Sequence, residues 1–518
     1  MMSDSPVVIV GAGPAGLVLA VDLARRGIPL RIIEKAAAPS EASRAKGLQP
    51  RTLEILDDLG IIAPVLAGGA RFPHWRSYAG ETLLWERSIW ELLGREEPVA
   101  SEETPFPETW MIPQSRTERI LRERLAGYGV QIEYGAEFTG CRQDGDGVVV
   151  TMNTAAGPTQ ARCRFLVGAD GGRSAVRKAL AIPFRGETRD DERFLIADVE
   201  AADLDRRYWH NWSIQGDPVQ RISMCPLPGT SYFQFVAPLA ADIPAPEATL
   251  ETLQQLLDAR AGAASVPLAN PTWITLHRTN LRLAERYRCG AVFLTGDAAH
   301  SPPQGAGQGL NISVQDAFNL GWKIAAVLRG APEGLLDSYE RERRPFAAGK
   351  LGVLPEMLRA AGLDDEDEAE RRQAEIANDL FHLQLHYRDS PAVREARAEP
   401  SGPRAGDRAP DARVSDASGA IRRVFDLCRG PHFTLLAFSP ESADLCGEIA
   451  SSWSVDIHVH LAHRPATGGG FLHEIYGVAA GSTTILLIRP DGYIGLAADT
   501  DLRKELHGYF SQVAAPRP

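Results

Sequence analysis

The chain has 518 residues, 44% of them hydrophobic and 24% charged, and a formal net charge of −12 at pH 7. This size and composition indicate a globular protein of several domains, and the negative charge argues against a nucleic-acid partner because phosphates would repel it. No apolar run approaches the ~20 residues of a membrane span, and the N-terminus lacks a signal peptide, so we expect no membrane contact, a cytoplasmic location and six unpaired cysteine thiols.

The first motif describes a strand, a tight turn and a helix. Residues 7–10 are β-branched, and Gly11, Gly13 and Gly16 follow with the spacing GxGxxG. Gly11 permits the turn, Gly13 lets the backbone approach a pyrophosphate, and Gly16 lets the helix pack closely on the sheet. Glu34 ends the next strand, where its carboxylate can accept hydrogen bonds from an adenosine ribose. The pattern predicts a dinucleotide-binding domain.

The first 70 residues alternate strand and helix, as in an open parallel sheet, and the pattern then changes. The expected elements are an irregular stretch at 69–107, a helix at 116–128, paired strands within 130–150, a strand at 165–168 and a helix at 175–180. The tryptophans of the irregular stretch either cover a cleft or serve as packing residues. The last strand and helix flank the turn Gly-Ala-Asp-Gly, which contains Asp170.

Between residues 184 and 277 the pattern changes to alternating segments typical of antiparallel strands, at 208–212 and 232–236, with one helix at 249–259. A sheet inserted into a nucleotide-binding domain is a plausible substrate module, because ligands favour crevices between domains. The candidate substrate contacts are Trp209, Trp212, Tyr232 and Phe235. Such aromatic residues are equally common in an ordinary core.

Residues 291–295 restart the parallel pattern and lead to Gly-Asp-Ala-Ala-His, which contains Asp297 and His300. Asp297 can accept hydrogen bonds from a ribityl hydroxyl, whereas we expect His300 to make a structural hydrogen bond. A glycine-rich loop then opens a helix at 310–328, whose N-terminus can stabilise negative charge on a reduced flavin. Another helical stretch covers 332–359.

The remaining chain reads as an acidic loop, a linker and a small α/β domain. The acidic run 364–368 is expected to be solvated rather than to bind a metal, and the sequence predicts no metal site. Residues 399–412 are rich in Pro, Gly, Arg and Asp, which marks a linker. The following domain lacks CxxC, because Cys428 and Cys446 lie too far apart, so we expect a structural or dimer-modulating role rather than thiol exchange.

The ordered motifs GxGxxG, Gly-Ala-Asp-Gly and Gly-Asp-Ala-Ala-His resemble those of the FAD-dependent aromatic hydroxylases of the para-hydroxybenzoate hydroxylase type, the single-component flavoprotein monooxygenases. Residues 5–395 carry the resemblance, and 386–391 and 489–493 are similar to the longer members with a thioredoxin-like tail. Many of those act on aromatic polyketides in antibiotic biosynthesis, and others act on smaller phenols.

The resemblance implies an α/β fold with four segments. These are the two parts of a Rossmann-like FAD-binding domain at 1–180 and 281–398, an inserted antiparallel-sheet substrate domain at 181–280, and a thioredoxin-like α/β domain at 399–518.

The resemblance also implies which residues bind the cofactor. These are Gly11, Gly13, Ala15, Gly16, Glu34, Lys35, Arg44, Ala45, Gln114, Asp170, Asp297, Pro303, Gly307, Gly309, Leu310 and Asn311. Asp170, with Arg173, would also assist nicotinamide binding, and Pro303 would line the flavin and substrate face. The sequence Ser-Pro-Pro-Gln-Gly places its proline pair one position earlier than in many relatives, which leaves the substrate's position open.

The implied reaction uses NADPH or NADH to reduce FAD, which then forms a hydroperoxide with O₂ and hydroxylates a small aromatic substrate. The flavin would swing between exposed and buried positions, because no second nucleotide fingerprint seats the nicotinamide. The sequence identifies no catalytic base and leaves a monomer or a homodimer open. Two alternatives are a Baeyer–Villiger or ring-opening oxygenation on the same scaffold, and a flavin- or ligand-binding homologue without turnover.

Overall fold

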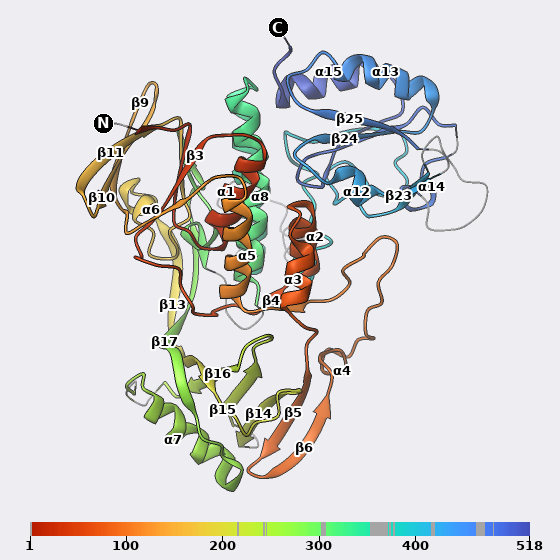
Figure 1. Ribbon diagram of the computed structural model, residues 1–518. Coiled ribbons are helices and arrows are strands. Elements are labelled where there is room, and N and C mark those ends of the chain that lie inside the picture. Colours follow the sequence, from red (N-terminus) through yellow and green to blue (C-terminus); the bar gives the residue numbers. More distant parts are fainter. Residues whose placement is uncertain are drawn as a thin grey trace.

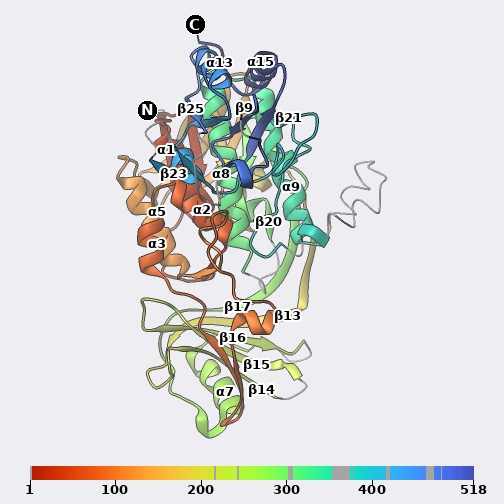
Figure 2. The same cartoon turned by 90° about the vertical axis from the view of Figure 1, so that its right-hand side faces the viewer.

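The computed structural model describes residues 3–214, 217–241, 244, 246–301, 307–352, 371, 374–376, 379–415, 420–462, 472–479 and 481–517. Pro303 and the acidic run 364–368 lie outside these residues. Three regions follow one another along the molecule: an eight-stranded sheet at one end, a central α/β region and a C-terminal α/β domain at the other end (Figures 1 and 2). None of the described helices is both long and apolar enough to cross a membrane.

The central region is built on a six-stranded sheet of apolar, buried strands. In sheet order these are β18 (Arg288–Cys289), β19 (Val292–Leu294), β12 (Phe165–Gly168), β2 (Val7–Val10), β3 (Leu30–Glu34) and β8 (Ile132–Tyr134). All neighbours from β19 to β8 are parallel. Parallel strands end at the same edge of a sheet, so the turns that carry the three motifs meet there.

Helices cover this sheet, and α1 (Pro14–Arg25) packs against both α5 (Gln114–Ala126) and α8 (Gly309–Leu328) (Figure 1). The other elements of the region are β4 (Gly47–Leu48), α2 (Pro50–Asp58), α3 (Ile62–Gly68), β7 (Trp110–Met111), α6 (Ala175–Ala179), η2 (Gly296–Ala298), η4 (Glu333–Leu336) and α9 (Asp337–Lys350). A second sheet contains β1 (Ser3–Asp4), β11 (Gly157–Cys163), β10 (Gly147–Thr154) and β9 (Glu137–Asp144), which confirms the hairpin turning at 144–147.

The eight-stranded sheet combines strands from distant parts of the chain. In sheet order these are β20 (His300–Ser301), β17 (Ala269–Ala284), β13 (Phe184–Glu200), β16 (Tyr232–Leu239), β15 (Asp217–Pro226), β14 (Tyr208–Ile214), β5 (His74–Ala79) and β6 (Thr82–Arg87). The long antiparallel pair β13 and β17 joins the sheet to the central region (Figure 2). Helix α7 (Leu250–Ala261), followed by η1 (Gly262–Ala264), packs on one face and buries a hydrophobic cluster.

The prediction of an irregular stretch at 69–107 is wrong over residues 74–93. This segment forms β5, β6 and the short helix α4 (Ile89–Leu93). β5 pairs in parallel with β14, so its partner lies far away in the sequence. A local pattern could not identify that pairing, because the edge hairpin becomes stable only when the larger sheet exists.

The C-terminal domain is a five-stranded mixed sheet between two hydrophobic clusters. In sheet order its strands are β21 (Arg394–Ala396), β27 (Ile494–Ala498), β26 (Ile485–Ile488), β24 (Phe433–Ala437) and β25 (Ile457–Leu461). Its other elements are β22 (Arg413–Ser415), β23 (Ile421–Arg423), α12 (Val424–Cys428), α13 (Pro440–Ala450), α14 (Leu472–Ile475) and α15 (Leu502–Val513). The expected α/β fold class is confirmed, whereas the limits of the four segments stay predictions.

A buried cluster of charges ties α8 and α9 to the C-terminal domain. The guanidinium of Arg489 donates to both carboxylate oxygens of Glu342 at 2.8 Å, and Lys323 Nζ lies 2.7 Å from the same carboxylate. Burial lowers the pKa of Lys323 to about 8. Burial would raise the pKa of Glu342, but Arg489 and Lys323 outweigh it and hold that pKa well below its ordinary value. The domain contact therefore depends on charges that water does not solvate.

We predict that Arg489→Met destabilises the C-terminal domain by about 3–5 kcal/mol, because it leaves Glu342 and Asp491 without their buried guanidinium partner. The matched control is Arg503→Met, which removes an exposed ion pair with Glu448 and should leave the stability of the domain nearly unchanged, because solvent screens that pair. Hydrogen exchange of the β24 amides measures both effects. Equal losses in the two variants would show that the buried cluster does not hold the domain.

Candidate functional site

The three glycines of the first motif have different structural roles. Gly11 has φ +104°, and a side chain there would lie 2.3 Å from the carbonyl oxygen of Ala169. A side chain at Gly16 would lie 2.0 Å from the carbonyl oxygen of Gly11. Gly13 differs, because, its chain neighbours apart, no atom of the described residues lies within 4 Å of the position that its side chain would take. Gly11 and Gly16 are thus required by packing, and Gly13 leaves open space before α1.

That open space lies at the start of α1, whose N-cap residue Gly13 has no side chain to accept a hydrogen bond from the helix. Uncapped N–H groups at a helix N-terminus favour an anion. Glu34 lies beside them, and its Oε2 accepts a hydrogen bond from the Ala12 N–H at 2.9 Å. Its Oε1 accepts from Ala36 N–H at 3.0 Å, and both oxygens keep further acceptor capacity. Lys35 is exposed next to it.

The loop before β4 forms another wall of this space. Gln114 fixes it, because Gln114 Oε1 accepts from the Ala45 N–H at 3.1 Å and Gln114 Nε2 donates to Glu118 at 2.8 Å. The amide of Gln114 therefore positions the loop. Arg44 on this loop is exposed, and among the described residues its guanidinium makes no hydrogen bond or ion pair. Arg44 is thus a cation free to meet a bound anion.

Asp297 lies where α1 and α8 converge. A side chain at the preceding Gly296 would touch Ala15 of α1 at 3.0 Å and Ser313 of α8 at 2.9 Å. Asp297 is itself solvent-accessible, and packing around its carboxyl group raises its pKa, opposed by His300 and Arg44. A ligand can therefore reach this carboxylate, and we call the accessible space beside it the opening.

Asn311 holds the first turn of α8 in place. Its Nδ2 donates to the carbonyl oxygens of Gly47 at 2.9 Å and Gly307 at 2.8 Å, and its Oδ1 accepts from the Gln49 N–H at 2.8 Å. Gly307 has φ +62°, which favours glycine. Gly309 opens α8, and Leu310 is buried. These predicted cofactor residues lie together on one side of the opening, and Pro303 lies outside the described residues.

Asp170 caps α6. Its carboxylate accepts from Ser174 Oγ at 2.5 Å and from the Ala175 N–H at 2.6 Å. This capping explains the residue, so contact with a flavin or a nicotinamide stays a prediction. Arg173 beside it is exposed. Arg177, which no sequence motif singled out, joins two motifs, because its guanidinium donates to the carbonyl oxygens of Ala298 and Gly172.

The expected structural role of His300 is confirmed. His300 Nε2 lies 2.6 Å from Asp316 Oδ2, and Arg343 Nε donates to Asp316 Oδ1 at 2.7 Å. All three side chains are buried. Burial would raise the pKa of Asp316, but Arg343 and His300 outweigh it and lower that pKa.

Strand register determines which side chains of the eight-stranded sheet face the opening. Asp198 on β13 lies opposite Gln234 on β16 and Trp273 on β17, so the three side chains share a face. This face meets the loop before β4, because Ser43 N–H donates to Asp198 Oδ2 at 3.0 Å and Lys46 Nζ donates to Gln234 Oε1 at 2.5 Å. We define these two contacts as the loop clamp.

The predicted substrate contacts divide between the two faces. Trp209 lies on the face of the loop clamp, since Lys46 Nζ is 4.7 Å from its ring centroid. Tyr232 shares the face of Gln234 by alternation along β16. The prediction is wrong for Trp212 and Phe235, which are buried in the cluster that packs on α7. Side chains alternate across a strand, so each of these residues points away from the opening.

Asp198 and Gln234 were missed, although each is an isolated polar residue in an apolar strand segment, which is a signal that the sequence carries. Asp198 Oδ2 also accepts from Trp273 Nε1 at 2.7 Å, whereas Oδ1 has no hydrogen-bond partner among the described residues. Burial raises the pKa of Asp198 to about 6, opposed by Trp273, Ser43 and Lys46. The loop clamp thus depends on a carboxyl group that titrates near neutral pH.

The site fits FAD. The open space at Gly13 and the uncapped N-terminus of α1 suit a pyrophosphate. Glu34 and Arg44 can contact the rest of an adenosine diphosphate, and Asp297 offers an accessible carboxylate after β19.

Comparisons with known proteins agree with this geometry. Residues 4–351 match the family model described as an FAD binding domain, and residues 402–516 match the one described as aromatic-ring hydroxylase, C-terminal. The chain is 42% identical to a flavin-dependent monooxygenase of Mycobacteroides abscessus, covering 95% of this chain and 97% of the relative. It is 32% identical to the 6-methylpretetramide 4-monooxygenase of Streptomyces rimosus, and the match covers 95% of this chain and 90% of that relative. Among solved structures, aklavinone-11 hydroxylase with FAD and aklavinone is similar, with a TM-score of 0.80, 26% identity and 99% coverage of each chain.

We predict that Gly13→Ala weakens FAD retention by about tenfold or more, because a methyl group enters the space left for the pyrophosphate. The fold should persist, since Gly13 has an extended backbone that alanine also adopts. Gly140→Ala in β9 is the matched control, because it also adds a methyl group to open space. Equilibrium FAD titration with the apoprotein gives the two affinities, and equal affinities would contradict the assignment.

We predict a pH-dependent gain in stability for Asp198→Asn. The pKa of Asp198 is raised from 3.8 to about 6 in the folded chain, so between these values the folded state binds more protons than the unfolded state. Its contribution to stability is therefore present in acid and is lost as the pH rises through about 6, by roughly 3 kcal/mol. The variant should match the wild type at low pH and exceed it above neutrality.

Thermal unfolding at about pH 4 and about pH 8 checks this difference. Asp205→Asn is the control, because Arg207 holds the pKa of Asp205 at about 2 and this variant should not gain stability in alkali. A gain for Asp198→Asn that does not change with pH would show that the carboxyl group is not the cause.

Proposed function

The chain belongs to the family of FAD-dependent aromatic-ring hydroxylases, and on this premise we propose that it hydroxylates a polycyclic aromatic substrate of polyketide type with NADPH or NADH as electron donor. That it is an FAD-dependent monooxygenase follows from the family. The substrate class is supported by relatives named for 6-methylpretetramide and aklavinone. The alternative of a flavin-binding homologue without turnover is not supported, because the relatives reported above are monooxygenases.

One observation carries the proposal: the glycine turn after β2 and Asp297 after β19 lie at the same edge of the parallel sheet. The loop clamp joins the loop before β4 to the polar and aromatic face of the eight-stranded sheet. Cofactor and substrate elements thus meet between two regions of the molecule. Ligand sites favour such crevices.

In this arrangement Gly13, Glu34 and Arg44 would hold the adenosine diphosphate of FAD, and Asp297 would hold its ribityl chain. Gly307, Gly309 and Asn311 would border the flavin ring. When bound, FAD takes a hydride from the reduced nicotinamide and activates O₂, so that one oxygen atom enters an aromatic C–H bond and the other leaves as water.

The chain's own residues orient the substrate and exclude water. Trp209 packs beside two other aromatic rings, since its ring centroid lies 4.3 Å from that of Trp75 and 5.9 Å from that of Phe72. Its Nε1 donates to Ser223 Oγ at 2.5 Å, which fixes the plane of the ring. A fixed indole beside the cation of Lys46 gives a flat, electron-rich substrate a surface to stack on. A dry site also protects the activated oxygen from loss to water.

The cellular setting that we infer is the reducing cytoplasm. All six cysteines are free thiols, which supports this location. The oligomeric state, monomer or homodimer, stays a prediction.

We predict that polycyclic phenols, naphthoquinones or anthraquinones stimulate NADPH or NADH oxidation by the purified flavoprotein. With ¹⁸O₂, one labelled atom should appear in a phenolic hydroxyl group. Label in an ester would instead establish a Baeyer–Villiger reaction, and the absence of stimulation by every compound would contradict the proposed substrate class.

Trp209→Ala should lower kcat/KM for the active compound by about tenfold, because the stacking surface is lost. Trp209→Phe is the matched control, since it keeps an aromatic ring and loses only the hydrogen bond to Ser223. If both variants lose the same activity, the ring does not act by stacking.

A further inference from the structure

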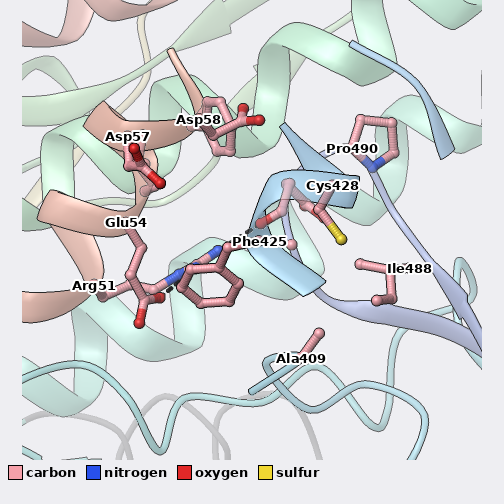
Figure 3. A pocket seen from close by; sticks show the side chains of 13 residues that line it. Arg51, Glu54, Asp57, Asp58, Ala409, Phe425, Cys428, Ile488 and Pro490 are labelled. Carbon is pink, nitrogen blue, oxygen red and sulfur yellow. Dashed lines mark hydrogen bonds and ion pairs between the residues drawn. The ribbon is translucent and has the colours of Figure 1, made fainter. Parts of the chain in front are cut away.

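The loop between α12 and β24 anchors the C-terminal domain on the central region. Gly430 N–H donates to Asp58 Oδ1 at 2.8 Å, and Arg429 lies 2.9 Å from Asp57. A pocket beside this loop is lined by Asp57 and Asp58 of α2 and by Cys428 of α12 (Figure 3). The loop ends at His432, whose position is therefore determined by contacts on both sides of the junction.

His432 is held in the orientation of a metal ligand. Its Nε2 lies 2.8 Å from the carbonyl oxygen of Leu427, and a carbonyl only accepts, so Nε2 carries the proton. In the neutral ring Nδ1 then keeps its lone pair, and among the described residues Nδ1 has no hydrogen-bond partner. A ring N–H donated to a carbonyl is the usual support of a metal-bound histidine.

Two further ligand groups lie next to this ring. The parallel pairing of β24 with β25 places His458 opposite Thr434, at the edge of the sheet. The His458 ring stacks on the His432 ring, with 3.7 Å between centroids and 16° between planes. His458 Nε2 lies 3.3 Å from Asp456 Oδ2. One ligand atom from each of His432, Asp456 and His458 lies within 4.8 Å of the other two.

The cluster is open to solvent on one side. His432 is buried, whereas Asp456 and His458 are exposed, so an ion and its water ligands can enter. His460 lies two residues further along the same face of β25.

We propose that His432, Asp456 and His458 form a binding site for a divalent transition metal of the zinc class, completed by water. Two imidazole nitrogens and one carboxylate oxygen suit Zn²⁺, Ni²⁺ and Cu²⁺ rather than Mg²⁺ or Ca²⁺. Zinc binds imidazole nitrogen at about 2.0–2.1 Å along the lone pair in the plane of the ring. Binding therefore requires the exposed His458 ring to turn out of its stack on His432, so that both lone pairs point to one position. The bound ion would join the junction loop to the edge strand β25 and would have a structural role.

The test uses the full-length flavoprotein after treatment with EDTA, titrated with Zn²⁺ by calorimetry. We expect one Zn²⁺ per chain, with an affinity that falls by about tenfold or more in His458→Ala and in His432→Ala. His74→Ala is the matched control, because this exposed histidine also lies beside a carboxylate, that of Glu86, and should leave the affinity unchanged.

If His432→Ala does not fold, His458→Ala decides alone, because its side chain is exposed on an edge strand. With Cu²⁺ as the probe, electron paramagnetic resonance should show coupling to two imidazole nitrogens in the wild type and to one in His458→Ala. The proposal is overturned if no Zn²⁺ binds, or if the affinity is the same in the wild type and in His458→Ala.

Discussion

The buried carboxylate of Asp316 is the constraint on which the rest of the site depends. It accepts hydrogen bonds from His300, Arg343 and the backbone of Gly296, and none of these side chains reaches water. A buried charge that loses one partner costs several kcal/mol. The segment after β19 that carries Asp297 is therefore fixed against α8, and the first turn of α8 stays near the N-terminus of α1. Ion pairing inside the protein thus decides where an exposed carboxylate can meet a ligand.

The polar face of the eight-stranded sheet is determined by register rather than by composition. The pair β13 and β17 extends from the central region into the eight-stranded sheet, so the sheet cannot shift without breaking a long ladder of backbone hydrogen bonds (Figure 1). The loop clamp then adds contacts from the Ser43 N–H and the Lys46 side chain to the same face. Together these contacts hold the loop before β4 and the polar face in one geometry, which is what the proposed transfer of oxygen between two bound molecules would require.

The C-terminal domain is joined to the central region by charged contacts. Burial raises the pKa values of Cys428 and Cys446 to about 12, so neither thiol is poised for exchange chemistry, in line with the lack of CxxC. Its contacts with the central region are arginine–carboxylate pairs, as at Arg408 and Glu54, and the buried cluster around Arg489. The metal site that we propose lies at the same junction.

The sequence by itself determined the local elements and the family. Strand β2, the glycine turn after it, helix α1 and strand β3, which ends at Glu34, are encoded by residues close together in the chain. Glycine spacing and β-branched runs therefore predicted them correctly. Only the tertiary structure decided which aromatic side chains face the opening, that residues 74–87 join the sheet through β14, and that His432 meets His458. Each of these depends on pairing between segments far apart in the chain, and local patterns carry no information about which distant strand supplies the neighbour.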